Sequence, residues 1–327
     1  MTGPPPPRRP PGRRLAGWAA GLLVAVPTLT TGCRLLDTDA LTPVPQALSF
    51  LPWLILPAAL ALLLALAARE RLLAGWAALV LGATAWCVLP HGPATTTARG
   101  PVVARLRVLA ANVEFGQATG DLAAAVRRER PHLVHVCECD RSCVRTLTAA
   151  LGASHPYRAV VDGAGSAGSV ILSALPLTAR PAIPAAMGMP GATARIGGRD
   201  VELRLAHPLP PLPGQVDLWK SELGRLERFA AEHGDSGPVL LAGDFNASQD
   251  HAAFRSVLAA GRLHDAARLA GAARTPTWPR EGPLPPYVQI DHVLVSDDFR
   301  VHGVRFLDLA GTDHRAVLAE LDLHAGR

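Results

Sequence analysis

The chain has 327 residues, 49% of them hydrophobic, and carries a formal net charge of +5. Its length exceeds that of one average domain. Residues 1–103 contain 8 arginines and 3 acidic residues, whereas residues 104–327 contain 24 basic and 24 acidic residues. A domain that grips a phosphate backbone nonspecifically carries a basic surplus. Polymeric nucleic acid is therefore disfavoured as the main partner of residues 104–327, which carry no net charge.

Three apolar runs in the amino-terminal part are long enough to cross a bilayer. The runs cover about residues 15–31, 48–68 and 72–89. Each is close to the roughly 20 residues that a spanning helix needs. We therefore predict a membrane domain at residues 15–90, a disordered basic segment before it at 1–14, and a linker after it at 91–103.

The arginines predict how these spans are oriented. Four arginines precede the first run, and the tight turn Arg69-Glu70-Arg71 carries two more. The loop between the first two runs has Arg34 but also two aspartates. Under the positive-inside rule the amino terminus and the Arg69 turn are cytoplasmic. Three spans then place everything after Pro90 outside the cytoplasm.

The first run has a second interpretation, as a cleaved signal peptide. Thr30-Thr31-Gly32-Cys33 would then form a lipoprotein-like cleavage site. Thr30 fits this poorly, since a branched aliphatic residue is usual there. Both interpretations leave the domain at residues 104–327 outside the cytoplasm.

The part of the chain after the linker alternates strands and helices. We predict strands at 106–113, 132–136, 169–172, 201–206, 239–241, 288–295 and 316–323. We predict helices at 121–130, 142–151 and 252–260, and a further helix in which Leu218, Leu223, Leu226 and Phe229 recur at helical spacing. Gly197-Gly198 signals a hairpin. The alternation predicts an α/β domain.

Residues that can bind a metal or transfer a proton lie at the ends of many predicted strands. They are Asn112, Glu138, His207, Asp244, Asn246, Asp291, Asp313 and His314. Asp244-Phe245-Asn246 taken alone is as easily an ordinary turn after a strand. Because open α/β sheets bind ligands at the carboxyl ends of their strands, we predict that all eight side chains converge on one rim.

These segments resemble the endonuclease/exonuclease/phosphatase superfamily. In family order they are Ala111-Asn112-Val113, Glu138, Leu205-Ala206-His207-Pro208, Gly243-Asp244-Phe245-Asn246, Ile290-Asp291-His292-Val293-Leu294 and Thr312-Asp313-His314. The resemblance covers about residues 104–324 and implies a four-layer α/β sandwich of the DNase I-like type. The three spans, with His207-Pro208 and Pro210-Pro211, are most similar to the membrane-bound VanJ-type teicoplanin-resistance branch.

The resemblance also implies a cofactor, Mg²⁺ or Mn²⁺ in its place. Glu138 resembles the principal metal ligand, supported by Asn112 and Asp313. Asp244 resembles the residue that orients or deprotonates the attacking water, and Asn246 the residue that holds the phosphate. Oxygen donors of this kind are those that Mg²⁺ prefers.

Three further residues take catalytic roles by the same resemblance. His314 would contact a phosphoryl oxygen, and Asp291 would hold its imidazole. His207 resembles a further phosphate-contacting or proton-donating group. A carboxylate next to a histidine suits this chemistry, because it fixes the tautomer and supports the imidazolium.

The residues around Glu138 admit several interpretations. His135, Cys137, Cys139 and Cys143 could form a zinc set, although their spacing matches no common structural site. Alternatively Cys137 or Cys139 is simply buried, or Cys139 and Cys143 form an extracytoplasmic disulfide.

Three other side chains near the motifs are less informative. His292 faces either the site or the opposite side of its strand. Trp219 and Trp278 flank the predicted rim loops, and core packing is the simplest role for both.

Together these features predict a membrane-anchored, Mg²⁺-dependent phosphohydrolase that acts outside the cytoplasm. The resemblance implies a lipid-linked phosphate or diphosphate of the cell envelope, such as an undecaprenyl carrier, as substrate. Three alternatives remain: a metal-dependent endonuclease, a sphingomyelinase-like phosphodiesterase, and a non-catalytic membrane sensor or scaffold. The complete residue set argues against the last. The sequence predicts no oligomeric state.

Overall fold

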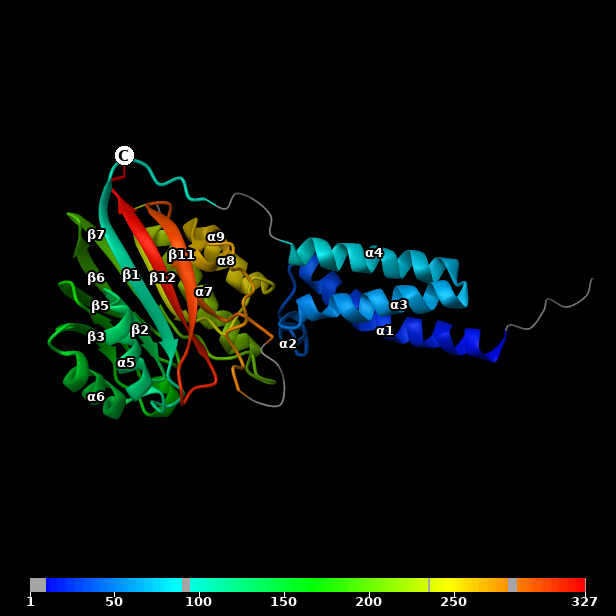
Figure 1. The fold of residues 1–327 in the computed structure, drawn as a ribbon, viewed down its shortest axis with the longest axis horizontal. Coiled ribbons are helices and arrows are strands. Elements are labelled where there is room, and N and C mark those ends of the chain that lie inside the picture. Colours follow the sequence, from blue (N-terminus) through cyan, green and yellow to red (C-terminus); the bar gives the residue numbers. More distant parts are fainter. Residues whose placement is uncertain (1–9, 90–94, 235, 282–286, 327) are drawn as a thin grey trace, which may run out of the picture. The chain divides into compact units, whose positions relative to one another are not determined.

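The computed structural model describes residues 10–89, 95–234, 236–281 and 287–326. The chain divides into two compact units. We call them the helical unit (Met1–Asp39 with Pro43–Pro90) and the sandwich unit (His91–Arg327 with Ala40–Thr42). Both are drawn in Figure 1.

The helical unit contains three helices that are long and apolar enough to cross a membrane. They cover Pro11–Leu35, Leu51–Ala68 and Arg71–Val88. The elements of the unit are α1 (Pro11–Leu35), α2 (Val44–Leu48), the 3₁₀ turn η1 (Leu51–Leu54), α3 (Ile55–Ala68) and α4 (Arg71–Val88). Of the segment predicted to be disordered, residues 11–14 are helical and residues 1–9 lie outside the described residues.

Small side chains and a few polar contacts hold these helices together. Ala20, Ala65 and Ala74, one from each long helix, form a buried cluster. Small residues let helix backbones approach closely where lipid removes the hydrophobic driving force. The hydroxyls of Thr31 and Thr84 lie 2.7 Å apart and join α1 to α4.

The described part of the sandwich unit contains two six-stranded sheets. The first has the order β11-β12-β1-β2-β4-β3, with β1 (Val102–Asn112), β2 (Leu133–Cys137), β3 (Tyr157–Val161), β4 (Ser169–Ser173), β11 (Phe299–Asp308) and β12 (Arg315–His324). The second has the order β5-β6-β7-β8-β10-β9, with β5 (Leu177–Ile183), β6 (Met189–Ile196), β7 (Arg199–Ala206), β8 (Val239–Asp244), β9 (His264–Asp265) and β10 (Asp291–Val295).

Alternating side chains build the four layers seen in Figure 1. Val108 and Ala110 of β1 point into the core between the sheets, whereas Leu109 and Ala111 pack in the helix-covered outer core. The period of two is that of a strand buried on both faces. Helices α5 (Thr119–Glu129) and α6 (Arg141–Leu151) cover the first sheet, and α7 (Val216–His233) and α8 (Ala252–Gly261) cover the second. The predicted four-layer sandwich is confirmed.

Helix α7 buries three of the four residues predicted for its apolar face, Leu223, Leu226 and Phe229. Trp219, Leu223 and Leu226 are fully buried against the second sheet. Leu218, predicted to lie on that face, is 41% exposed. The stripe also includes Glu222, whose side chain is fully buried. Apolar periodicity does not indicate Glu222, because its side chain is polar.

Strand directions bring the polar strand ends to one edge of the sandwich. Asn112 ends β1 and Glu138 follows β2, and these two strands are parallel. Asp244 ends β8 and pairs directly with Asp291, the first residue of the antiparallel β10. Strand β12 runs antiparallel to β1, so His314, just before its start, lies at the same edge. We call this edge the rim.

Three glycines have positive φ angles that the fold requires. Gly197 and Gly198 have φ of 56° and 81° and form the predicted turn between β6 and β7. Gly243 has φ of 146°, and a Cβ atom there would lie 2.2 Å from the carbonyl oxygen of Ala206. A side chain at Gly243 would therefore separate β8 from β7 just before Asp244.

We expect Gly243→Ala to lower the free energy of unfolding of the sandwich unit by about 3 kcal/mol, because it adds a backbone clash to an unfavourable φ. Gly198→Ala is the matched control: its φ is also positive, but nothing lies within 4 Å of the added Cβ. It should cost about 1 kcal/mol. Denaturant unfolding of both variants checks this, and equal losses would contradict the steric argument.

Candidate active site

Asn112 connects the two sheets at the rim. Its Nδ2 atom lies 3.1 Å from Glu138 Oε1, in the loop after β2, and 3.1 Å from Asp244 Oδ2, at the end of β8. Glu138 has φ of 58°, and its Oε2 accepts a hydrogen bond from the Phe115 backbone N–H at 3.0 Å. One carboxamide therefore holds a carboxylate from each sheet in a fixed place.

Glu114 is an acidic residue of the rim that the strand-end motifs did not indicate. Its backbone N–H donates to Asn112 Oδ1 at 3.0 Å, and its Oε2 accepts from the backbone N–H of Asp313 at 2.8 Å. Trp278 Nε1 donates to Asp313 Oδ2 at 2.8 Å. Trp278 is only partly buried and belongs to none of the buried core clusters of the described residues, so it orients a predicted metal ligand instead of packing in the core. The only signal for Glu114 was its place two residues after Asn112.

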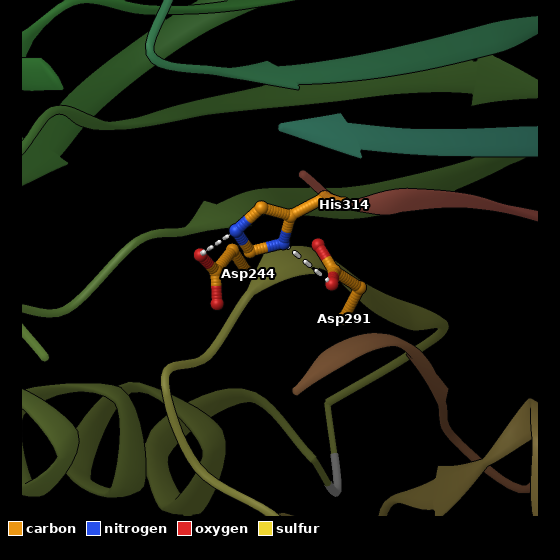
Figure 2. Close-up of side chains that lie close together, drawn as sticks. All are labelled: Asp244, Asp291 and His314. Atoms are coloured by element: carbon orange, nitrogen blue, oxygen red, sulfur yellow. Dashed lines mark hydrogen bonds and ion pairs between the residues drawn. The ribbon is translucent and has the colours of Figure 1, made fainter. Parts of the chain in front are cut away.

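The imidazole of His314 lies between two buried carboxylates (Figure 2). Its Nδ1 is 2.9 Å from Asp291 Oδ2, and its Nε2 is 3.8 Å from Asp244 Oδ2. Asp313 Oδ1 lies 3.7 Å from the same Nε2. His314 and Asp291 therefore form a carboxylate–histidine pair that directs Nε2 toward Asp244 and Asp313.

Burial and proximity shift the pKa values of this cluster. Burial and then repulsion from Asp291 raise the pKa of Asp244 to about 7. Burial opposes protonation of His314, but Asp291 and Asp244 outweigh it and raise the pKa of the imidazole to about 10. His314 is therefore an imidazolium at neutral pH, and Asp244 can gain or lose a proton near neutrality, as a general base must.

His207 follows β7, which runs parallel to β8, and so lies at the same end of the second sheet. Its side chain is fully buried, and neither ring nitrogen has a hydrogen-bond partner among the described residues. Burial, followed by repulsion from His314, lowers the pKa of His207 to about 3. A neutral imidazole can donate an N–H to a phosphate, but it has no acidic proton to give away near pH 7.

Asn246 is held by contacts on every side. Its backbone N–H donates to Asp244 Oδ1 at 2.8 Å, and its Nδ2 donates to the carbonyl of Pro208 at 2.9 Å. Its own carbonyl accepts from Trp219 Nε1 at 3.1 Å. Its φ of 47° is uncommon for a residue other than glycine. The loop after β8 is thus fixed in a conformation that its neighbours impose.

Seven of the eight predicted residues are joined into one network by these hydrogen bonds and ion pairs, and His207 lies beside it without a hydrogen bond. The roles of the residues stay predictions.

The predicted metal ligands fit a hard divalent cation. Glu138 and Asp313 offer carboxylate oxygens, the donors that Mg²⁺ and Mn²⁺ take. Asn112 turns its Nδ2 toward Glu138 and Asp244, and its Oδ1 accepts the backbone N–H of Glu114. A second group, Asp244, Asp291 and His314, has potential ligand atoms that all lie within 4.8 Å of one another. A metal at this second group would have to displace the proton that Asp291 and Asp244 favour on His314. The chemistry of the donors therefore favours the first group.

A disulfide lies directly beside Glu138. Cys139 and Cys143 are bonded, while Cys137 is free and buried. The disulfide alternative is therefore confirmed and the zinc alternative is wrong, because two of its sulfur ligands are consumed. Asp140 caps α6 within the bridged loop by accepting from the backbone N–H groups of Ser142 and Cys143.

His292 faces away from the site. Its Nδ1 lies 3.1 Å from Asp265 Oδ2 and its Nε2 lies 3.1 Å from the carbonyl oxygen of Ala247. Both of these partners are acceptors and so favour a charged imidazole, although Gln289 Nε2 also lies 3.4 Å from Nδ1. Burial opposes this charge, but Asp265 outweighs it and raises the pKa of His292. His292 thus fixes the loop after Asp244 from behind.

Comparison with known proteins gives one family. A model of the endonuclease/exonuclease/phosphatase family matches residues 109–314. This range includes all eight predicted residues. No curated protein matches the chain.

Solved structures show the same fold. An endonuclease/exonuclease/phosphatase from Beutenbergia cavernae is 21% identical, covering 68% of this chain and 72% of its own, with a TM-score of 0.55. A humanized TDP2 from D. rerio is 15% identical, covering 66% of this chain and 98% of its own, with a TM-score of 0.55. An endonuclease/exonuclease/phosphatase family protein from Bacteroides thetaiotaomicron is 16% identical, covering 67% of this chain and 98% of its own, with a TM-score of 0.52.

We expect His292→Gln to lower the free energy of unfolding by about 3 kcal/mol at pH 6, because it leaves a buried Asp265 without its cation. The pKa of His292 is raised on folding from 6.5. The imidazolium therefore contributes its full stability below pH 6.5, and this contribution is lost as pH rises through the folded pKa. Denaturant unfolding of both proteins from pH 6 to 9 should show the difference shrinking. A constant difference would contradict a charged His292.

Proposed function

The chain belongs to the endonuclease/exonuclease/phosphatase family, and from this premise we propose that its sandwich unit hydrolyses phosphoric esters or anhydrides with a divalent metal ion. Members of this family are generally metal-dependent phosphoester hydrolases. The observation that carries the proposal is the His314 imidazole between Asp291 and Asp244, linked through Asn112 to Glu138.

Each part of this arrangement answers a demand of phosphoryl transfer. The reaction needs negative charge neutralised on the phosphoryl oxygens and a water molecule held in line. The His314 imidazolium is held by Asp291 and donates a charged N–H hydrogen bond to the phosphoryl group. Asp244 lies next to it and accepts a proton from the water. Neutral His207 and Asn246 add hydrogen-bond donors to the phosphate.

Glu138, Asn112 and Asp313 would hold the metal. When bound, Mg²⁺ or Mn²⁺ would neutralise phosphoryl charge as a Lewis acid. Trp278 supports this role because it donates to Asp313 Oδ2, and a ligand whose second oxygen is engaged keeps its orientation. Glu114 fixes the backbone of Asp313 by accepting its N–H.

The substrate we favour is a lipid-linked phosphate or diphosphate of the cell envelope, such as an undecaprenyl carrier. Two observations support it beyond the motif resemblance to the VanJ-type branch. Three helices apolar enough to span a membrane are part of the same chain, which raises the effective concentration of any membrane-bound headgroup. Residues 104–327 also carry no net charge, unlike a domain that grips nucleic acid.

We place the site outside the cytoplasm. The arginines before the first helix and in the Arg69-Glu70-Arg71 turn support this orientation by the positive-inside rule. The Cys139–Cys143 disulfide supports it independently, because such bonds persist in oxidising compartments.

Purified full-length protein in detergent should release phosphate from an isoprenyl diphosphate with Mg²⁺ and lose this activity with chelator. Asp291→Asn removes the carboxylate that holds His314, and we expect kcat to fall roughly 10²- to 10⁴-fold with little change in the Mg²⁺ requirement. Glu138→Gln should instead raise the Mg²⁺ concentration needed for half-maximal activity by roughly 10- to 100-fold.

The same assay separates the rival functions. Turnover of plasmid DNA with the diphosphate untouched would identify a nuclease, and headgroup release from sphingomyelin would identify a phosphodiesterase. Absence of turnover on all of these, with Mg²⁺ and with Mn²⁺, would favour a sensor or scaffold.

We expect the sandwich unit to be accessible from outside the cytoplasmic membrane. In spheroplasts, a bulky maleimide should label Ser154→Cys, chosen because Ser154 lies on the surface loop after α6. A cysteine in the Arg69-Glu70-Arg71 turn should react only after the membrane is broken. Labelling in the reverse order would place the site in the cytoplasm and exclude the envelope substrate.

A further inference from the structure

Glu222 is a fully buried glutamate whose carboxylate binds two loops at once. Its Oε1 accepts the backbone N–H of Ala186 at 2.7 Å, and its Oε2 accepts the backbone N–H of Leu209 at 2.8 Å. Ala186 belongs to the loop between β5 and β6, and Leu209 follows His207 and Pro208. A glutamate of α7 therefore fixes the chain two residues after a predicted phosphate contact.

Trp219, one turn earlier on the same face of α7, holds the loop after β8, which contains Asn246. Its indole N–H donates to the carbonyl of Asn246 at 3.1 Å, and the Asn246 side chain donates to the carbonyl of Pro208 at 2.9 Å. The loop after His207 and the loop after Asp244 are thus both bound to α7, and the Asn246–Pro208 hydrogen bond joins them to each other. Trp219 is also fully buried, so its contact geometry is set by packing.

His207 depends on this support more than other residues of the site do. Neither of its ring nitrogens has a hydrogen-bond partner among the described residues. The ring is therefore located only by packing and by its backbone. On its carboxyl side that backbone is held at Pro208 by Asn246 and at Leu209 by Glu222.

A carboxylate is the side chain that this position requires. Two backbone N–H groups point at Glu222, so both of its terminal atoms must be acceptors. Glutamine has nearly the same shape but offers one acceptor and one NH₂ group. It would oppose one of the two N–H donors and leave that donor buried without a partner, a costly arrangement.

We propose that Glu222 and Trp219 are positioning residues that set the locations of His207 and Asn246 for phosphate binding. They touch no substrate and act only through the two loops. The inference rests on the proposed function to the extent that it takes His207 and Asn246 as phosphate contacts.

The test is a double-mutant cycle read out as the Kd of inorganic phosphate in the presence of Mg²⁺, measured by calorimetry on full-length protein in detergent. Glu222→Gln should weaken phosphate binding roughly 10- to 100-fold, the equivalent of one hydrogen bond to a charged group. In the His207→Ala background the same change should cost less than about threefold, because its effect passes through His207. Glu232→Gln, on an exposed position of α7, is the matched control and should leave the Kd unchanged.

Amide hydrogen exchange gives a readout that does not depend on phosphate. Exchange in the peptide 205–215 should rise in Glu222→Gln and stay unchanged in Glu232→Gln. Trp219→Phe keeps an aromatic ring but removes the indole N–H, so exchange should rise at residues 243–249. It also serves as the second variant if Glu222→Gln does not fold.

The inference is overturned if Glu222→Gln leaves exchange at 205–215 unchanged, or if its effect on Kd is as large with His207→Ala as without it. Failure of the proposed function looks different. If the protein hydrolyses none of the phosphate substrates but still shows the coupled loss of phosphate affinity, the proposed activity is rejected. The positioning role of Glu222 is then retained.

Discussion

The pairing of the His314 imidazolium with two buried carboxylates is the interaction on which the rest of the site depends. Asp291 and Asp244 are almost inaccessible to water, at 0% and 2% exposure. Charges removed from water are tolerated only when they are paired or hydrogen-bonded. Asp291 and Asp244 face each other across the β8–β10 pair, and repulsion between them is relieved by the single cation between them. Removing that cation would leave two like charges at the end of the central strands.

Backbone strain is concentrated around the same cluster. Among the residues at the rim, Glu114, Phe115, Glu138 and Asn246 all have positive φ without being glycine. Such conformations cost of order 1 kcal/mol or more each and persist only where the surroundings impose them. Here the imposing contacts are visible: Glu138 Oε2 holds the Phe115 N–H, and Asp244 holds that of Asn246. The site residues are therefore held by one another as well as by the sheets.

The strand ends could be predicted because polar residues after apolar runs are conspicuous in a sequence, and the direction of the strands then brings them together. The roles of residues on helices and in loops are harder to predict from the sequence. Glu222 lies in the buried stripe of α7, and a periodicity that counts only apolar residues does not indicate it. Which face His292 takes depends on the partner Asp265, 27 positions away in sequence. The disulfide was one of several options, since spacing alone does not fix cysteine pairing.

The charge balance of the rim gives an independent argument for a cation. Glu114, Glu138, Asp244, Asp291 and Asp313 bring five carboxyl groups to the rim, whereas His314 is the one cationic side chain in the network described above. Residues 104–327 as a whole have no positive surplus to compensate. A phosphate group approaching such a rim is repelled unless further positive charge is held there. This need supports the proposal that Glu138 and Asp313 help to hold a metal ion. A divalent cation held there would supply the positive charge that a phosphate group needs to approach this rim.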